Sequence, residues 1–169
     1  MEAKADVRLA VAQDAVLIGN VARRTWNDAY AGIILPENQE RLLVRWYAPA
    51  ALEEAIGQSQ SWFYVAVVQG EVIGFAQFIM RDNGRGELTR IYVLPEWQRQ
   101  GVGSGLLGEG LAALSTHGAD EVFVHVEKGN AGGIGFYERR GFHLVREFSL
   151  ELPEQNLELL EYALSLGAR

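Results

Sequence analysis

The sequence contains no cysteine, which excludes disulfide bonds, thiolate metal sites and a cysteine nucleophile. Basic residues are also scarce, since 15 lysines and arginines stand against 22 acidic residues and give a formal charge of -7. A nucleic acid would meet net repulsion, so we expect no nucleic-acid partner. Long apolar runs are absent too: the longest, 62–68, is far shorter than the roughly 20 residues of a membrane helix.

The first twelve residues hold no apolar core of the length found in signal peptides. With the lack of cysteine, this favours a cytoplasmic protein without a membrane partner. What the chain does have is an ordinary globular composition, with 49% hydrophobic and 22% charged residues over 169 positions. No repeat, linker or charge block marks a boundary, so we expect one domain over residues 1–169.

Hydrophobic spacing predicts a mixture of helices and strands. Strands are expected at about 7–11, 62–68, 71–80, 87–93, 121–126, 142–150 and 157–163. Helices are expected after Asp14 and at about 36–47, 49–56, 101–116 and 131–140. Asp14 is placed to cap the first helix and Gly141 to end the last. A meander of strands that runs into a strand, helix, strand, helix unit predicts an α/β fold, with a mixed sheet flanked by helices.

Glycines concentrate in one part of the chain, with 11 of the 19 between Gly101 and Gly141. Glycine in a helix costs about 0.5–1 kcal/mol relative to alanine, so this density indicates a need for close backbone approach. The stretch 98–105 (QRQGVGSG) lies between a predicted strand and a predicted helix. Exposed backbone NH groups, the helix dipole and Arg99 suit a pyrophosphate there. The alternative is a tight connection whose glycines serve packing alone.

Gly103 to Gly108 also match the dinucleotide pattern G-x-G-x-x-G, with Glu127 at the end of the next strand, where a ribose-binding acid would lie. A dinucleotide turn follows its strand directly, whereas here residues 94–100 separate the strand end from the first glycine. The chain also lacks a second mononucleotide half. We therefore reject a Rossmann domain.

Two blocks of residues carry a family resemblance. The first is Q/R-x-x-G-x-G/A after a strand, matched by Gln98 to Gly103. The second is N-x-x-A-x-x-F-Y-x-x-x-G-F, in which Gly133 stands where alanine is usual and the matching residues are Asn130, Phe136, Tyr137, Gly141 and Phe142. In register, the two blocks resemble the GNAT superfamily of acetyl-coenzyme-A-dependent N-acetyltransferases. Residues 14–35 are similar to the acceptor-side helices of that family.

The resemblance implies a GNAT-type fold: a mixed, mostly antiparallel central sheet of six to seven strands with helices on both faces. It also implies acetyl-coenzyme A as co-substrate and no metal. Ile91, Tyr92 and Val93 would bind pantetheine through their backbone, with the Val93 NH polarising the thioester carbonyl. The other implied cofactor residues are Gln98, Arg99, Gln100, Gly101, Val102, Gly103 and Ser104 at the pyrophosphate, then Asn130, and Tyr137 near the sulfur.

The implied reaction is direct attack of a primary amine on the thioester. The amine must be neutral, although a free alkylamine has a pKa of about 10, so a base is useful. Glu87 and His125 match positions where family members place one, and we favour Glu87 slightly. Tyr137 is the implied general acid that protonates the departing thiolate.

Each of these side chains also has a plainer interpretation. Glu87 could be a solvated carboxylate beside Arg85 or Arg90. His125 lies on the strand face opposite three valines and could be a half-buried histidine with satisfied ring nitrogens. Tyr137 could be an ordinary amphipathic aromatic of the core.

The implied acceptor is a small-molecule amine, a polyamine or a peptide amino group, and Trp26 and Tyr30 are weak candidates for its pocket. A different class of function is a non-catalytic acyl-coenzyme-A-binding or regulatory module that keeps the glycine loop. The presence of Tyr137 together with a candidate base favours the enzyme. A homodimer is compatible with the habits of the family.

Overall fold

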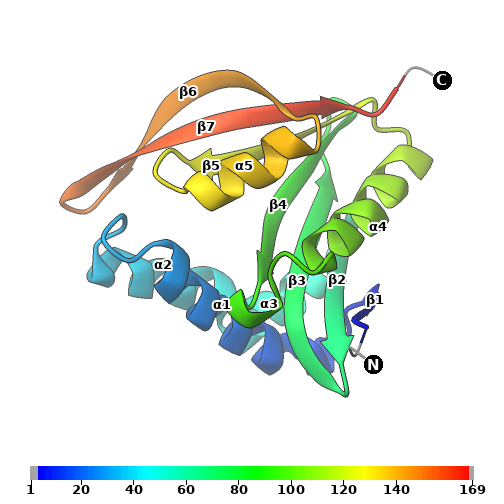
Figure 1. Ribbon diagram of the computed structural model, residues 1–169, viewed down its shortest axis with the longest axis horizontal. Helices are drawn as coiled ribbons and strands as arrows, with labels where there is room; N and C mark the ends of the chain where they lie inside the picture. The colour runs from blue at the N-terminus through cyan, green and yellow to red at the C-terminus, as the bar shows by residue number, and fades with distance from the viewer. Residues whose placement is uncertain (1–3, 168–169) are drawn as a thin grey trace.

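The structure, a computed structural model, describes residues 4–167, which form one sheet with helices packed against it (Figure 1). The strands are β1 (Asp6–Leu9), β2 (Ser61–Val68), β3 (Glu71–Met80), β4 (Arg85–Val93), β5 (Glu121–Glu127), β6 (His143–Leu152) and β7 (Gln155–Ser165). The helices are α1 (Ala15–Ala29), α2 (Pro36–Tyr47), α3 (Pro49–Gly57), α4 (Val102–Thr116) and α5 (Ala131–Arg139), with 3-10 turns η1 (Ala12–Asp14) and η2 (Pro95–Trp97).

The sheet is mixed and mostly antiparallel, as expected from the sequence. Its seven strands run in the order β1-β2-β3-β4-β5-β7-β6 within the described residues, and the pair β4–β5 alone is parallel. The β2–β3 hairpin turns at Gln69 and Gly70, which both have positive φ (50° and 83°), as a two-residue hairpin turn requires. The parallel pair therefore marks the one place where the meander gives way to a helical crossover.

Helices cover both faces of the N-terminal half of the sheet. Phe75 and Phe78 of β3 point to opposite faces because side chains alternate along a strand. Phe75 packs edge-on against Tyr47 of α2 at 5.9 Å. Phe78 lies against Gly110 of α4, where an added Cβ would be 2.1 Å from its ring. Figure 1 shows α1 and α2 on one side and α4 on the other.

The C-terminal half of the sheet has no described helix on the face opposite α5. Ile79, Phe123 and Ala163 are buried on that face, yet they lie outside the main hydrophobic core. Charged side chains cover them instead. The guanidinium of Arg85, for example, lies 4.3 Å from the centre of the Phe123 ring. This helix-free face is therefore both polar and accessible.

Strands β4 and β5 diverge after a short parallel stretch. Their pairing begins at Arg85 and Glu121 and ends at Leu88 and Val124. Beyond this point, β4 pairs only with β3, and β5 pairs only with β7, within the described chain. A fork therefore opens in the middle of the sheet, with one unpaired strand edge on each side.

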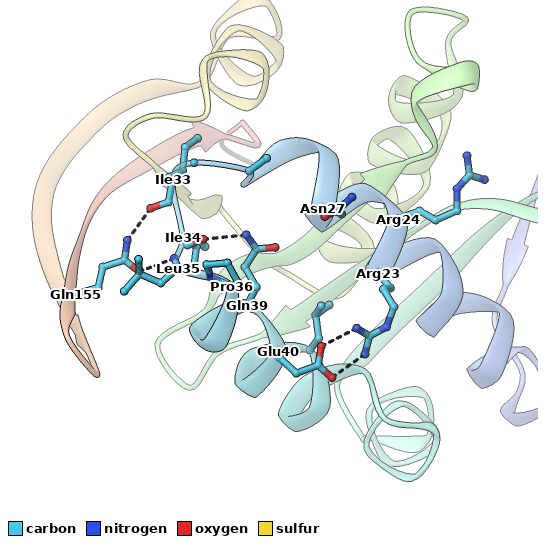
Figure 2. A pocket seen from close by; sticks show the side chains of 13 residues that line it. Arg23, Arg24, Asn27, Ile33, Ile34, Leu35, Pro36, Gln39, Glu40 and Gln155 are labelled. Carbon is cyan, nitrogen blue, oxygen red and sulfur yellow. Dashed lines mark hydrogen bonds and ion pairs between the residues drawn. The ribbon is translucent and has the colours of Figure 1, made fainter.

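The β6–β7 turn is tied to the loop between α1 and α2. Gln155 donates from Nε2 to the carbonyl of Ile33 at 2.6 Å, and its Oε1 accepts from the NH of Leu35 at 3.0 Å, as Figure 2 shows. The buried Asn38 of α2 donates to the carbonyl of Pro153 at 2.9 Å. These bonds fix the position of the loop between α1 and α2.

The predicted cap at Asp14 was wrong. Asp14 occupies the position before α1, but its carboxylate makes no capping bond to that helix. It accepts two bonds from the Arg8 guanidinium, at 2.8 and 3.0 Å, and one from the NH of Val11 at 2.8 Å. The carboxylate therefore joins β1 to η1, because a charged guanidinium is a stronger donor than a backbone NH.

Replacement of Asp14 by asparagine should destabilise the protein at neutral pH and not in acid. The Arg8 hydrogen bond lowers the pKa of Asp14 below 3.8, against the opposing effect of burial. A carboxyl whose pKa is lower in the folded state stabilises above its ordinary pKa, and this stabilisation is lost as the pH falls through the folded value. We expect Asp14→Asn to cost about 1–3 kcal/mol at neutral pH. In thermal melts, a gap to wild type that persists in strong acid would contradict this assignment.

Candidate active site

The glycine loop joins β4 to α4 and ends in a left-handed turn. Arg99 and Gly101 have positive φ values of 59° and 83°, and Gly101 immediately precedes α4. Gln98 donates from Nε2 to the carbonyl of Val93 at 2.9 Å, which ties the loop to the end of β4. The first backbone NH groups of a helix have no partner within it, so the NH groups at the start of α4 are available to an anion. The geometry therefore suits the predicted pyrophosphate site.

Helix α5 supports this site from the side. A Cβ on Gly103 would lie 2.9 Å from Phe136, so the glycine permits the two helices to touch. Arg140 stacks on Phe136 at 3.6 Å and donates from Nη2 to Ser104 Oγ at 2.5 Å. A cation thus lies at the helix start, in addition to the exposed Arg99. Arg140 could not be predicted from the second motif, because the motif allows any residue at that position.

The edge of β4 that faces the fork offers a backbone donor. The NH of Leu94 donates to Ile73 of β3 at 2.9 Å. Successive NH groups of a strand point to opposite sides, so the NH of Val93 points away from β3, toward the fork. The NH of Ile91 shares this direction by the same alternation. These are the backbone groups for which the sequence predicted a cofactor contact.

Three tyrosines from three different elements meet near the fork. The hydroxyls of Tyr30 (after α1) and Tyr92 (β4) are 2.9 Å apart. Burial raises the pKa of Tyr30 to about 12 and raises the pKa of Tyr92 well above its ordinary value. Burial and the nearby Tyr30 also raise the pKa of Tyr137 on α5. All three hydroxyls therefore keep their protons at neutral pH and can act as hydrogen-bond donors.

Asn130 lies just before α5 and explains why residue 133 is glycine and not the alanine that is usual in the motif. Its Oδ1 accepts from the NH of Gly133 at 3.0 Å, which caps the helix. A Cβ at Gly133 would lie 2.8 Å from Asn130 Nδ2. Glycine at this position therefore gives room to the capping side chain. Asn130 also lies close to the Tyr30 hydroxyl, whose pKa its hydrogen bond lowers against the larger effect of burial.

The two base candidates lie on the same face of the sheet but at different distances from the fork. Glu87 pairs with Phe123, within the parallel stretch, and its Oε2 is held by Nε and Nη2 of Arg81. Its partner is thus neither of the arginines considered in the sequence analysis. His125 is the first β5 residue beyond the last β4–β5 pair, and its Nε2 lies 2.9 Å from Glu161 Oε1. Among the described residues, the plainer interpretation of His125, a ring with satisfied nitrogens, has support at Nε2 alone.

The two acceptor candidates lie inside an aromatic cluster. The ring of Trp26 lies 5.0 Å from that of Tyr30 and 6.3 Å from that of Tyr92. Trp26 is 4% exposed, and its buried Nε1 has no hydrogen-bond partner among the described residues. Trp26 therefore supports the tyrosine cluster from behind, and Tyr30 is the one of the two whose hydroxyl reaches toward Asn130.

A surface pocket of about 800 Å³ lies beside this cluster, between α1, α2 and the loop that joins them. Figure 2 shows Arg23 and Glu40 paired across it, with Gln155 at one end. Neither Trp26 nor Tyr30 is among the described residues that line it. The lining residues are Arg23, Arg24, Asn27, Ala31, Gly32, Ile33, Ile34, Leu35, Pro36, Gln39, Glu40, Leu43 and Gln155.

Between residues 4 and 167, no group of three or more His, Cys, Asp or Glu side chains is arranged to hold a metal ion. Over the same range, no helix has the length and hydropathy needed to cross a membrane.

Comparison with known proteins identifies the family. The sequence model of the acetyltransferase (GNAT) family matches residues 23–142, which hold the glycine loop, the fork and the tyrosine cluster. The chain belongs to the GNAT family of acetyltransferases. This result confirms the family predicted from the two motifs, and with it the enzyme class, an acetyltransferase.

Individual relatives agree with this GNAT assignment. The spermidine N(1)-acetyltransferase of Thermoplasma acidophilum is 30% identical over 141 residues, covering 81% of this chain and 87% of the relative. The crystal structure of PaiA N-acetyltransferase from the same organism, in complex with coenzyme A, superposes with a TM-score of 0.80 at 26% identity, covering 93% of this chain and 97% of that one. A GCN5-related N-acetyltransferase from Rhodopseudomonas palustris has a TM-score of 0.79 at 19% identity, over 98% of both chains, and so supports the fold.

Proposed function

We propose that this GNAT protein transfers an acetyl group from acetyl-coenzyme A to a primary amine by direct attack. The observation that carries the proposal is the fork, where an unpaired β4 edge, a glycine-rich helix start and the Tyr137 hydroxyl converge. A pantetheine chain fits an unpaired strand edge, since it can take the hydrogen bonds of a missing strand. The coenzyme-A complex of the related PaiA protein supports this choice of co-substrate.

Different residues of the chain bind the cofactor, stabilise the developing charge and protonate the leaving group. The NH groups at the start of α4, with Arg99 and Arg140, hold the pyrophosphate. Bound acetyl-coenzyme A supplies the thioester. The Val93 NH is a fixed donor for the negative charge that develops on the thioester oxygen, and such preorganised donors are a large catalytic term. Tyr137 donates its proton, or a hydrogen bond, to the departing sulfur.

We assign the base to His125 rather than to Glu87. Direct attack needs a neutral amine, and the proton it loses must pass to a group beside the fork. His125 begins the diverging part of β5, whereas Glu87 lies within the paired part and is bound by Arg81. This choice reverses the slight preference given by the sequence, because the Arg81 contact cannot be read from sequence spacing.

The base assignment predicts a contrast between two variants. At neutral pH, His125→Ala should lower kcat/KM about 100-fold, because base catalysis contributes about 10²–10⁴. Its rate should approach that of wild type as the pH nears 10, where the amine is already neutral. Glu87→Gln should stay within several-fold of wild type throughout. Equal losses in both variants, or a larger loss in Glu87→Gln, would return the role to Glu87.

Arg140 tests the cofactor site without touching the reacting atoms. Arg140→Met keeps the stem that packs on Phe136 and removes the charge beside Ser104. We expect the dissociation constant of acetyl-coenzyme A to rise about tenfold, the size of one charge-assisted hydrogen bond. Arg139→Met is the matched control, since it removes the same charge from the preceding residue, the last of α5. Equal effects of the two variants in a calorimetric titration would show that the charge acts at long range only.

The proposed amine acceptor is a small amine, a polyamine or a peptide amino group. The relative that acetylates spermidine makes polyamines the first class to test. Purified protein, acetyl-coenzyme A and a panel of polyamines, amino acids, aminoglycosides and short peptides are incubated, and free thiol is followed beside a binding titration. Thiol release that depends on one acceptor class supports the proposal. Tight binding without turnover on any member favours the non-catalytic binding module. A cytoplasmic location and a homodimer stay predictions from the sequence.

A further inference from the structure

One buried carboxylate on the helix-free face contacts nitrogen atoms of side chains from three other strands. The side chain of Glu161, on β7, is 6% exposed. Its Oε1 lies 2.9 Å from His125 Nε2 on β5 and 3.2 Å from Arg146 Nη2 on β6. Its Oε2 lies 3.6 Å from Arg85 Nη2 on β4. A buried charge with this many partners is well satisfied and held in one position.

The ionisation of Glu161 determines which nitrogen of His125 carries a hydrogen. Burial raises the pKa of Glu161, but the hydrogen bonds from His125 and Arg146 outweigh it and lower the pKa. An ionised carboxylate accepts hydrogen bonds and donates none, so Nε2 of His125 must be the donor. A neutral imidazole has one N–H, and its other nitrogen, Nδ1, therefore keeps a free lone pair.

We propose that Glu161 is a positioning residue that holds His125 as the Nε2–H tautomer, so that Nδ1 can accept the proton of the amine. The inference rests on the proposed function, in which His125 is the base. Before the attack, the ammonium form of the acceptor gives one proton to Nδ1, and the ring becomes imidazolium. The neutral nitrogen then bonds to the acetyl carbon while the bond from carbon to sulfur breaks and Tyr137 protonates the sulfur. The Nε2–H bond to Glu161 persists through this step, so a fixed negative charge faces the new positive charge.

The remaining neighbours of His125 are consistent with this role. From β4, Arg85 and Glu87 face the same side of the sheet, and each is already engaged with a charge of opposite sign. From β6, Phe148 packs on the imidazole at 4.8 Å, and from β5 itself Phe123 lies at 5.4 Å. The aromatic rings fix the plane of the imidazole, while Glu161 fixes its hydrogen.

Nitrogen NMR of the ring in the protein without substrate tests the tautomer directly. At a pH where His125 is neutral, wild type should show Nδ1 with the shift of an unprotonated nitrogen and Nε2 with that of a protonated one. Glu161→Gln should give a mixture of tautomers, because an amide can either donate to or accept from the ring. The kcat of this variant should fall about 10-fold with little change in KM, which is less than the loss of about 100-fold expected for His125→Ala.

The control is Glu158→Gln, because this β7 carboxylate contacts Ser149 and not His125. We expect it to match wild type in tautomer and in kcat. A wild-type His125 ring protonated at Nδ1 would overturn the role of Glu161, and this result does not depend on whether Glu161→Gln folds. An unchanged tautomer and an unchanged kcat in Glu161→Gln would overturn it as well. If His125 were not the base, His125→Ala would keep full turnover whatever the tautomer. This result distinguishes a failure of the proposed base from a failure of the role of Glu161.

Discussion

Tyr137→Phe is expected to lower kcat about 1000-fold while the dissociation constant of acetyl-coenzyme A stays within about twofold of wild type. The substitution removes one hydroxyl and leaves the ring in its buried place beside Phe142, 5.4 Å away. Without this donor, the sulfur must depart as an unassisted thiolate. The raised pKa of Tyr137 keeps the hydroxyl protonated at neutral pH, so the donor is present whenever the thioester is bound. Stopped-flow thiol release and a calorimetric titration measure the two constants separately.

Tyr162→Phe is the control for this experiment. This substitution also removes a hydroxyl from a buried ring. In the wild type, the Tyr162 hydroxyl donates to Glu138 of α5 at 2.8 Å and not to a residue of the tyrosine cluster. We expect nearly unchanged turnover in this variant. Equal kcat in Tyr137→Phe and wild type would remove the acid role, and a parallel loss of binding would reduce Tyr137 to a packing residue.

Two alanine substitutions in one helix should change stability in opposite directions. Gly110 and Gly108 both lie in α4, where alanine is favoured over glycine by about 0.5–1 kcal/mol. Gly108 faces open space, so Gly108→Ala should stabilise by about that amount. At Gly110, a Cβ would lie 2.1–2.3 Å from three ring atoms of the fully buried Phe78. We expect Gly110→Ala to cost about 3 kcal/mol or more, because the ring has nowhere to move.

Urea denaturation of both variants measures this difference. A loss of about 3 kcal/mol is a large share of the 5–15 kcal/mol that holds a typical domain together. Gly110→Ala should therefore unfold at clearly lower urea concentration, and Gly108→Ala at slightly higher. Equal midpoints would contradict the close packing of α4 on β3.

The elements of the fold could be predicted from the sequence because their signals are local. Two apolar runs separated at hairpin length by Gln69 and Gly70 predicted β2 and β3. The positive φ of Gly70 and Gly141 follows from their place in a turn and after a helix. The predicted ends of β7 were less accurate than those of β2 and β3. The predicted strand 157–163 is shorter than the observed Gln155–Ser165, because its first residues are held by pairing with β6 and its last residues by pairing with β5, and not by a pattern of their own.

The parts of the site that the sequence missed depend on contacts between distant strands. Glu161 lies on a strand whose polar residues look like an ordinary solvated face, and its burial among His125 and two arginines arises only when β4 to β7 come together. Arg140 reaches Ser104 because α5 packs on the start of α4. Asp14 was misassigned for a local reason, since Arg8, six residues earlier, competes for its carboxylate across a turn.

We propose that the fork binds acetyl-coenzyme A and that its acetyl group passes there to an amine. The most direct test is to count products: wild-type protein is given acetyl-coenzyme A and spermidine, and free coenzyme A and acetylated amine are quantified by mass spectrometry in the same samples. We expect one acetylated amine for each thiol released, at a rate about 1000-fold lower in Tyr137→Phe than in wild type. Thiol release without an acetylated amine, or equal rates in the two proteins, would contradict it.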